Sequence, residues 1–174
     1  MKRSIRLWQL CGFAVTSVLG TALHFLYDWL GGALWVAPFS GVSESTWEHM
    51  KLLLWPMFIF SIVESFFFSD RHDFWCVKLR GILTGLSLIP VLFYTYNGAI
   101  GKSPDWLNIT IFFVSAAVAF IYETRLFNKA PLRCSSKKLC FATICAIALL
   151  FVIFTFNTPT LGIFKDPITG SYGI

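Results

Sequence analysis

Long runs of apolar residues, separated by short polar breaks, dominate the chain from residue 7 to residue 156. Each run is close to the length of about 20 residues that an α-helix needs to cross the hydrocarbon core of a bilayer. The pattern predicts five membrane-spanning helices, over approximately 7–30, 47–68, 75–97, 106–127 and 138–156. We therefore expect an all-α fold, with residues 1–174 forming a single transmembrane domain and residues 157–174 an outer C-terminal tail.

The first run is expected to stay in the protein as a span. It follows the basic residues Lys2, Arg3 and Arg6, as the apolar part of a signal peptide would. However, it is longer than the roughly 7–15 apolar residues of such a peptide, and no small-x-small cleavage site follows it.

Composition indicates that lipid is the solvent around most of the chain. The sequence is 56% hydrophobic and 13% charged, whereas soluble domains carry about 25% charged residues. Five spans within 174 residues leave no room for a soluble domain. We find no basic domain with interleaved aromatic residues, so nucleic acid is not an expected partner. The predicted surroundings are the lipid bilayer of the plasma membrane.

Lysine and arginine are distributed unevenly between the two sides of the predicted bundle. Eleven of the 14 lie at the N-terminus, between the second and third runs, or between the fourth and fifth; only Lys51, Lys102 and Lys165 lie on the other side. With Asp and Glu included, the first side carries a net charge of +7 and the second −2. Because short cytoplasmic loops are enriched in Lys and Arg, we expect a cytoplasmic N-terminus and an outer C-terminus.

The cytoplasmic half of this topology also holds the five cysteines and, within its predicted spans, the carboxylates of Glu64 and Glu123. We expect no disulfide, because no cysteine lies in an outer loop and no C-x-x-C spacing occurs. Glu64 and Glu123 are expected to pair with basic residues of the rim, such as Arg80 or Arg125. The cysteines are Cys11, Cys76, Cys134, Cys140 and Cys145.

Residues 42–56, "VSESTWEHMKLLLWP", place several ionisable groups at the start of the second run. Ser45 and Glu48 have the spacing of a capping box, which is one sufficient explanation for that carboxylate. Lys51 can extend its ammonium group outward to water. A cap does not explain His49, which follows Ser45 by four residues and therefore lies on the same helix face.

The first run contributes His24 and Asp28, again four residues apart. His24 lies about 9 Å from the end of its run at 1.5 Å per residue. Ionisable groups at such depth usually face the bundle interior and mark functional sites; a purely structural His–Asp pair is the alternative. Because the first connection is short, we expect both residues to meet Glu44, Glu48 and His49 in one outer site.

The residue types in this cluster suit a divalent metal, zinc or manganese, because two imidazoles and two carboxylates match the donors these ions prefer. The candidate ligands are His24, Asp28, Glu48 and His49. Glu44 is a candidate general base, and Tyr96 could orient a substrate. We predict no organic cofactor. The expected supporting residues are Ser45, Lys51, Asn97, Asp166 and Tyr172.

Three functions are compatible with this cluster. The first is a metal-dependent membrane hydrolase, although H-E-x-x-H and G-x-S-x-G motifs are absent. The second is a protein that binds or transports a cation or small solute; the chain lacks the internal repeat common in transporters, and a homodimer could supply a path. The third is a structural or accessory subunit with an unknown membrane partner. The sequence does not decide whether the protein is an enzyme.

Residues 47–51 read WEHMK and residues 166–173 read DPITGSYG. In these two motifs the chain resembles a family of small bacterial multi-pass membrane proteins, which share Trp-Glu-His-x-Lys after the first span and a closing Asp-Pro-x-x-Gly-x-Tyr-Gly. The resemblance covers nearly the whole chain. Because that family is uncharacterised, the resemblance implies a bacterial membrane protein and implies no particular activity.

Overall fold

The computed structural model describes residues 2–68, 70–101, 104–134 and 136–174. Over these residues it contains five long α-helices and one short 3-10 helix and has no β-strand. Each of the five is long and apolar enough to cross a membrane, so the predicted fold class and number of spans are confirmed. The elements are α1 (Lys2–Trp29), α2 (Thr46–Phe67), α3 (Phe74–Ile100), α4 (Asp105–Phe127), α5 (Lys137–Phe156) and η1 (Gly162–Phe164).

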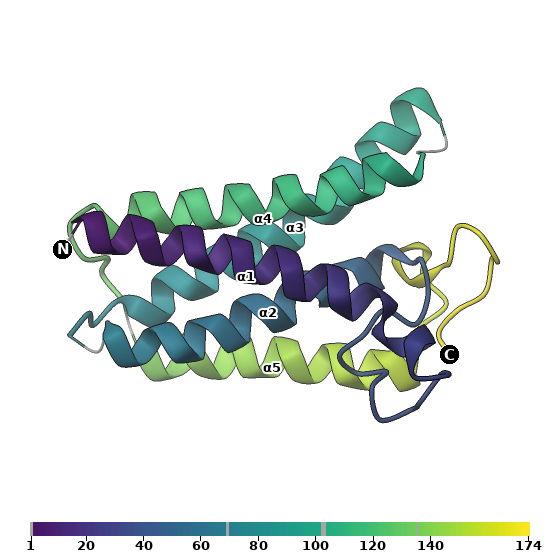
Figure 1. Ribbon diagram of the computed structural model, residues 1–174, viewed down its shortest axis with the longest axis horizontal. Helices are drawn as coiled ribbons and strands as arrows, with labels where there is room; N and C mark the ends of the chain where they lie inside the picture. The colour runs from purple at the N-terminus through teal and green to yellow at the C-terminus, as the bar shows by residue number, and fades with distance from the viewer. Residues whose placement is uncertain (1, 69, 102–103, 135) are drawn as a thin grey trace.

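The helices lie side by side along the long axis of the molecule (Figure 1). One end, here called the N-terminal end, holds the N-terminus and the connections from α2 to α3 and from α4 to α5. The other, the C-terminal end, holds residues 30–45 and the tail. Helix α2 contacts the other four helices. Of its most apolar stretch 61% is buried, against 17% for α1 and 22% for α5, so α2 is the centre of the bundle.

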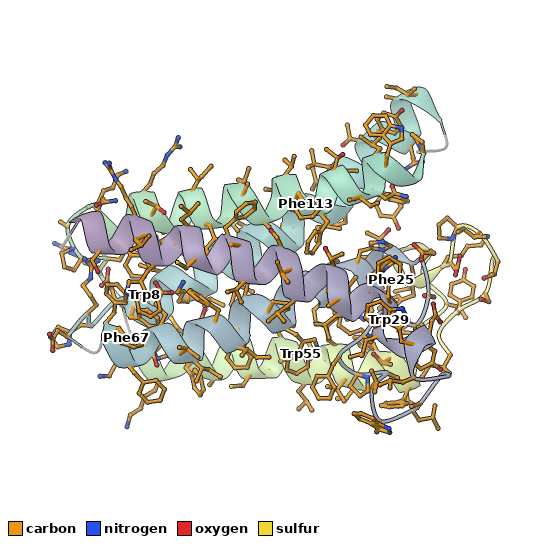
Figure 2. The ribbon with its side chains drawn as sticks, in the orientation of Figure 1. Trp8, Phe25, Trp29, Trp55, Phe67 and Phe113 are labelled. Carbon is orange, nitrogen blue, oxygen red and sulfur yellow. A yellow bond between two sulfur atoms is a disulfide. The ribbon has the colours of Figure 1, made fainter. Side chains whose placement is uncertain are left out.

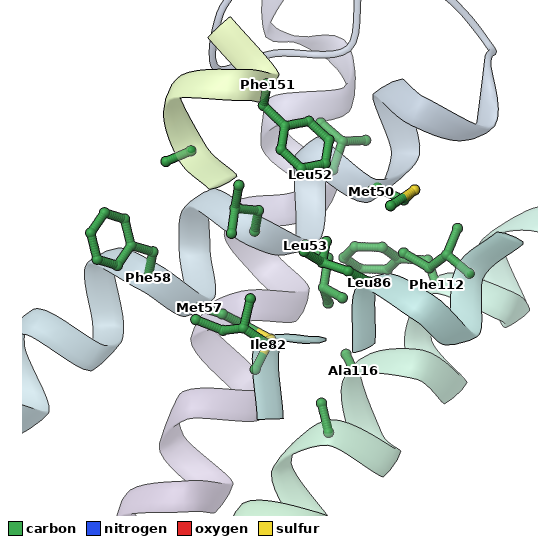
Figure 3. Packing of buried hydrophobic residues seen from close by; sticks show 14 of the residues in the cluster. Met50, Leu52, Leu53, Met57, Phe58, Ile82, Leu86, Phe112, Ala116 and Phe151 are labelled. Atoms are coloured by element: carbon green, nitrogen blue, oxygen red, sulfur yellow. The ribbon is translucent and has the colours of Figure 1, made fainter. Parts of the chain in front are cut away.

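The main core lies where α2 meets α3, α4 and α5 (Figure 3). Leu53 and Met57 of α2 are buried together with Ile82 of α3 and Ala116 of α4. Lipid tails are as apolar as these side chains, so the hydrophobic effect contributes little to association between spans. Close packing and buried polar contacts therefore have to hold the helices together.

The outward surface is apolar, as a lipid-facing surface has to be. Exposed side chains include Leu10, Val18 and Phe66. Aromatic pairs lie toward both ends of the bundle (Figure 2). Trp8 and Phe67 have ring centroids 4.5 Å apart near the N-terminal end, and Phe25 and Trp29 stack near the other. Tryptophan is enriched at membrane–water interfaces, which agrees with these positions.

A fully buried ionic cluster joins four helices in the N-terminal half. Lys78 of α3 forms ion pairs with Glu64 of α2 and with Glu123 of α4, the latter with Nζ and Oε2 2.5 Å apart. Gln9 of α1 donates a 2.7 Å hydrogen bond to Glu64 Oε1. All four side chains are at most 2% exposed. Both carboxylates pair with a basic residue of the cytoplasmic half, as expected, but the partner is Lys78 inside the bundle and not Arg80 or Arg125.

Candidate functional site

The entry to α2 is capped as its sequence predicts. Ser45 is the N-cap residue, and its Oγ accepts a 3.3 Å hydrogen bond from Glu48 N. The carboxylate of Glu48 does not return to Ser45 N, as a full capping box would require. Instead it accepts from Val42 N at 3.0 Å and lies 2.6 Å from Lys51 Nζ. Glu48 therefore fastens the chain before α2 to the first turn of the helix.

Lys51 does not extend into water as expected, and its side chain is 0% exposed. Besides its ion pair with Glu48, its Nζ donates to Ala37 O at 2.7 Å and to Thr155 Oγ1 of α5 at 3.1 Å. An ammonium group has three N–H donors, and all three find acceptors. Glu48 and Lys51 thus form a buried pair in which the ammonium group is saturated and Oε2 of the carboxylate is occupied.

The remaining ionisable groups form a second, less saturated set, which we call the His–Glu–His site. The carboxylate of Glu44 lies between two imidazoles: Oε1 is 3.6 Å from His24 Nε2, and Oε2 is 3.6 Å from His49 Nε2. The two ring centroids are 5.5 Å apart. Side-chain exposure is 29% for His24, 18% for His49 and 40% for Glu44, so the site is partly open.

A backbone contact fixes the orientation of His49. Its Nδ1 lies 3.0 Å from Ser45 O, one helical turn earlier. A carbonyl oxygen can only accept, so Nδ1 must carry the proton and donate it. In a neutral ring Nε2 is then a bare acceptor that faces another acceptor, Glu44 Oε2. This arrangement requires a proton, a donor or a cation between the two atoms.

The tail positions Glu44 from the far end of the sequence. It folds back over the C-terminal end, and Phe164 packs against Trp47 with ring centroids 4.7 Å apart. Asp166 Oδ2 accepts a 3.2 Å hydrogen bond from Glu44 N. Burial raises the pKa of Asp166, but this bond and those from the N–H groups of Ile168 and Thr169 outweigh it, so the pKa lies below its ordinary value.

A pocket of about 160 Å³ opens beside the two imidazoles, between α1, α2 and α4. Apart from the histidines, its wall is mainly apolar and includes Phe25 and Phe113, labelled in Figure 2. A much smaller cavity, about 10 Å³, adjoins Glu44 and His49 on another side and is lined in part by Asn108. Asn108 was not assigned to the site from the sequence; its position in the first turn of the fourth run was the only available signal.

Other residues expected at the site are not among the described residues that line the two cavities beside the imidazoles. Asp28 is exposed near the end of α1, and within the described residues its side chain makes no hydrogen bond or ion pair. Tyr96, in the last two turns of α3, is not among the described residues that line either cavity. Asn97 donates to Phe93 O on its own helix, and Tyr172 pairs with Lys165 within the tail. Roles for these residues stay predictions.

Three cysteines meet at the N-terminal end, which the sequence did not lead us to expect. Cys76 and Cys134 are joined as a disulfide, so the prediction of no disulfide is wrong. Cys140 Sγ lies 2.8 Å from Cys76 Sγ. Among the described residues, this is the one group of three or more potential metal ligands whose donor atoms all lie within 4.8 Å of one another. The predicted cluster of His and carboxylate residues is more open than that.

Comparison with known proteins places the chain in a family without assigning an activity. A family model described as "Family of unknown function (DUF6512)" matches residues 1–174. No curated protein and no solved structure matches the chain. The match agrees with the expectation of an uncharacterised family, and the two signature motifs stay a prediction. The bacterial origin, the plasma membrane and a homodimer or other partner stay predictions.

Proposed function

Because the chain belongs to a family of unknown function (DUF6512), we propose a function from its site alone: a multi-pass membrane protein that binds a divalent cation between His24, Glu44 and His49. We further propose that the ion serves the hydrolysis of an amphipathic ester or amide. The observation that carries the proposal is the hydrogen bond from His49 Nδ1 to Ser45 O, which leaves Nε2 facing Glu44.

This hydrogen bond is the usual support of a metal-binding histidine. Such a residue donates its other ring N–H to a backbone carbonyl or carboxylate, and this contact sets the tautomer and the direction of the free nitrogen. His49 meets that description before any ion is bound. A divalent cation would also relieve the opposition between Nε2 of His49 and the carboxylate of Glu44.

The distances at the site are close to those of a coordinated ion. Donor atoms on a tetrahedral zinc with bonds of 2.0–2.1 Å are about 3.3 Å apart. Each imidazole nitrogen lies 3.6 Å from an oxygen of Glu44. The two imidazoles, however, contact different oxygens, so small side-chain rotations would have to bring both nitrogens to one centre. Glu44 then replaces Glu48 as the carboxylate ligand, because Glu48 is already occupied by Lys51.

The adjoining pocket supports an amphipathic substrate. Its wall, mainly of aliphatic and aromatic side chains, suits an acyl chain, and the two histidines stand at one side of it. A bound divalent ion supplies polarisation of a carbonyl group and activation of water. Binding of an amphipathic molecule without catalysis is the second candidate function, and the same apolar wall favours it.

Histidine-selective isotope labelling tests the cation site directly, because the chain has three histidines. His72, exposed at the opposite end of the bundle, is an internal control. Titration of the protein in detergent micelles with Zn²⁺ or Mn²⁺ should perturb the imidazole signals of His24 and His49 and leave that of His72 unchanged. Glu44→Gln should weaken this response at least tenfold. A uniform response of all three signals, or none, contradicts the proposal.

Catalysis is tested separately with the zinc-loaded protein. A medium-chain p-nitrophenyl ester and the matching anilide are suitable probes, because each joins an acyl chain to a hydrolysable carbonyl. Turnover that disappears in His49→Ala and in Glu44→Gln supports a hydrolase. Zinc binding without turnover of either probe would remove support for these hydrolyses and favour the second candidate.

A further inference from the structure

We propose that Cys76, Cys134 and Cys140 form a second metal site, specific for a soft, thiophilic cation such as Zn²⁺ or Cu⁺. The site becomes available when the Cys76–Cys134 disulfide is reduced. It lies at the N-terminal end of the bundle and is independent of the His–Glu–His site at the other end.

The three sulfurs come from three separate parts of the chain. Cys76 lies in the first turn of α3, Cys134 in the segment before α5, and Cys140 in the first turn of α5. All three Sγ atoms lie within 4.8 Å of one another. Thiolates on a tetrahedral zinc, with Zn–S bonds of about 2.3 Å, are about 3.8 Å apart. After the S–S bond is broken, side-chain rotations have to widen the Cys76–Cys134 separation and the 2.8 Å Cys76–Cys140 separation to this value.

The backbone around the sulfurs is held by contacts other than the disulfide. Asp73 accepts from Arg71 Nε at 2.8 Å and from Leu132 N at 2.8 Å, which joins the start of α3 to the segment that carries Cys134. The rings of Trp75 and Phe141 lie 4.6 Å apart and join the starts of α3 and α5. The three cysteines should therefore remain neighbours after reduction.

The surroundings also suit the charge of the complex. Three thiolates on a divalent ion carry one negative charge in total. Arg71, Lys137 and Lys138 line a pocket of about 300 Å³ together with Trp75 and Phe141, the sequence neighbours of Cys76 and Cys140. Cys134 and Cys140 are partly exposed, so an ion can reach the sulfurs from outside the bundle. Three protein ligands also leave one coordination position for water or an external ligand.

Reduction and metal binding can be written as two balanced steps. A thiol reductant supplies two electrons and two protons to the Cys76–Cys134 bond and is itself oxidised to a disulfide. The cation then displaces one proton from each of the three thiols. If the N-terminal end faces the cytoplasm, as the Lys and Arg distribution predicts, the reduced form is the expected one, because disulfides are rare there.

Cadmium is a suitable probe, because its ultraviolet charge-transfer absorption reports sulfur ligands and is silent on histidine and carboxylate ligands. Phosphine-reduced wild-type protein in detergent micelles should bind about one Cd²⁺ with this absorption. Cys76→Ser, Cys134→Ser and Cys140→Ser should each weaken binding at least tenfold. Cys145→Ser, also in α5, and Cys11→Ser in α1 are the matched controls and should bind as the wild type does.

A second measurement uses the wild-type protein alone, because a cysteine variant could lose metal binding simply by misfolding. Bound Cd²⁺ or Zn²⁺ should protect Cys76, Cys134 and Cys140 from alkylation by N-ethylmaleimide, as read by peptide mass spectrometry, with Cys11 and Cys145 unaffected. Absence of the absorption, absence of protection, or a disulfide that persists in the reductant would each overturn the proposal. Neither readout depends on the imidazoles, so the result is separate from that for the His–Glu–His site.

Discussion

Lys51 keeps its ammonium group away from water, and acceptors from three parts of the chain surround it. Glu48 balances its charge, Ala37 O belongs to the segment before α2, and Thr155 belongs to α5. Such a pair adds little net stability compared with well-packed apolar residues. Removal of one partner, however, leaves the other charge buried and unpaired. The pair therefore fixes one arrangement of these three elements.

We predict that Lys51→Met destabilises the protein by about 3–5 kcal/mol, because it leaves the Glu48 carboxylate buried without its cation. The double variant Glu48→Gln, Lys51→Met should recover most of the loss. The midpoint of thermal unfolding, followed by circular dichroism in micelles, measures both effects. Lys165→Met is the control, because Lys165 is exposed. A Lys51→Met variant no less stable than this control would contradict the prediction.

Asp166 makes the docking of the tail sensitive to acid. Its folded-state pKa is lowered, so its contribution is complete above the ordinary value of about 3.9 and is lost as the pH falls through the lower folded value. We expect Asp166→Asn to lower the unfolding midpoint equally at neutral pH and near pH 5, and the difference from wild type to shrink toward pH 3. Asp70→Asn, exposed at the opposite end, should show no such pattern.

Spacing along the sequence predicted only part of the candidate site. Ser45 and His49 were expected on one helix face, and His24 was expected to face the bundle; both His24 and His49 now flank Glu44. The burial of Lys51 was not predictable. Its acceptors Ala37 O and Thr155 are distant from it in the sequence, and a local sequence pattern does not show that they lie close to it in space. The same is true of the contact between Asp166 and Glu44 N.

Helix α3 depends on a glycine at its contact with α4. A Cβ added at Gly81 would overlap the carboxyl group of Glu123, which has no open space to move into because it is fully buried. The absence of a side chain at Gly81 therefore lets Glu123 reach Lys78 between the two helices. Gly98, in the same helix, has no heavy atom within 4 Å of the position its Cβ would take.

These two glycines form a matched pair of substitutions. Gly81→Ala should destabilise the protein by about 1–3 kcal/mol through overpacking. Gly98→Ala should be neutral or stabilising, because alanine is the better helix former by up to about 1 kcal/mol. Unfolding midpoints in micelles compare them. Equal effects from the two substitutions would show that helix propensity, and not contact with Glu123, determines the result.

The five helices were predictable because each apolar run is long and clearly bounded. Predicted and observed bounds differ mainly at the first and third helices: α1 begins at Lys2, where the apolar run was placed from residue 7, and α3 ends at Ile100. The short helix η1 and the turn around Asp166 had no apolar pattern to reveal them. They are fixed by contacts with Trp47 of α2 and with Glu44 just before it, which exist only once the bundle has formed.

At the scale of the whole molecule, the uneven distribution of Lys and Arg predicts that the N-terminal end faces the cytoplasm. In a protein whose five native cysteines are replaced, Leu161→Cys in the tail should react with a membrane-impermeant maleimide in intact cells. Lys129→Cys, exposed at the other end, should react only after permeabilisation. The reverse labelling pattern would show the opposite orientation and would remove the argument that the three cysteines face a reducing compartment.

The ionic cluster of Glu64, Lys78 and Glu123 has a consequence for the order in which the helices leave the translocon and assemble. Ribosomes release Glu64 first, Lys78 next and Glu123 last. The α2–α3 hairpin can thus leave the translocon with Lys78 already neutralised by Glu64, whereas α4 inserts with a carboxylate whose partner lies in the preceding helix. We therefore expect biogenesis to proceed outward from the α2–α3 hairpin, with α4 retained beside it until Glu123 docks.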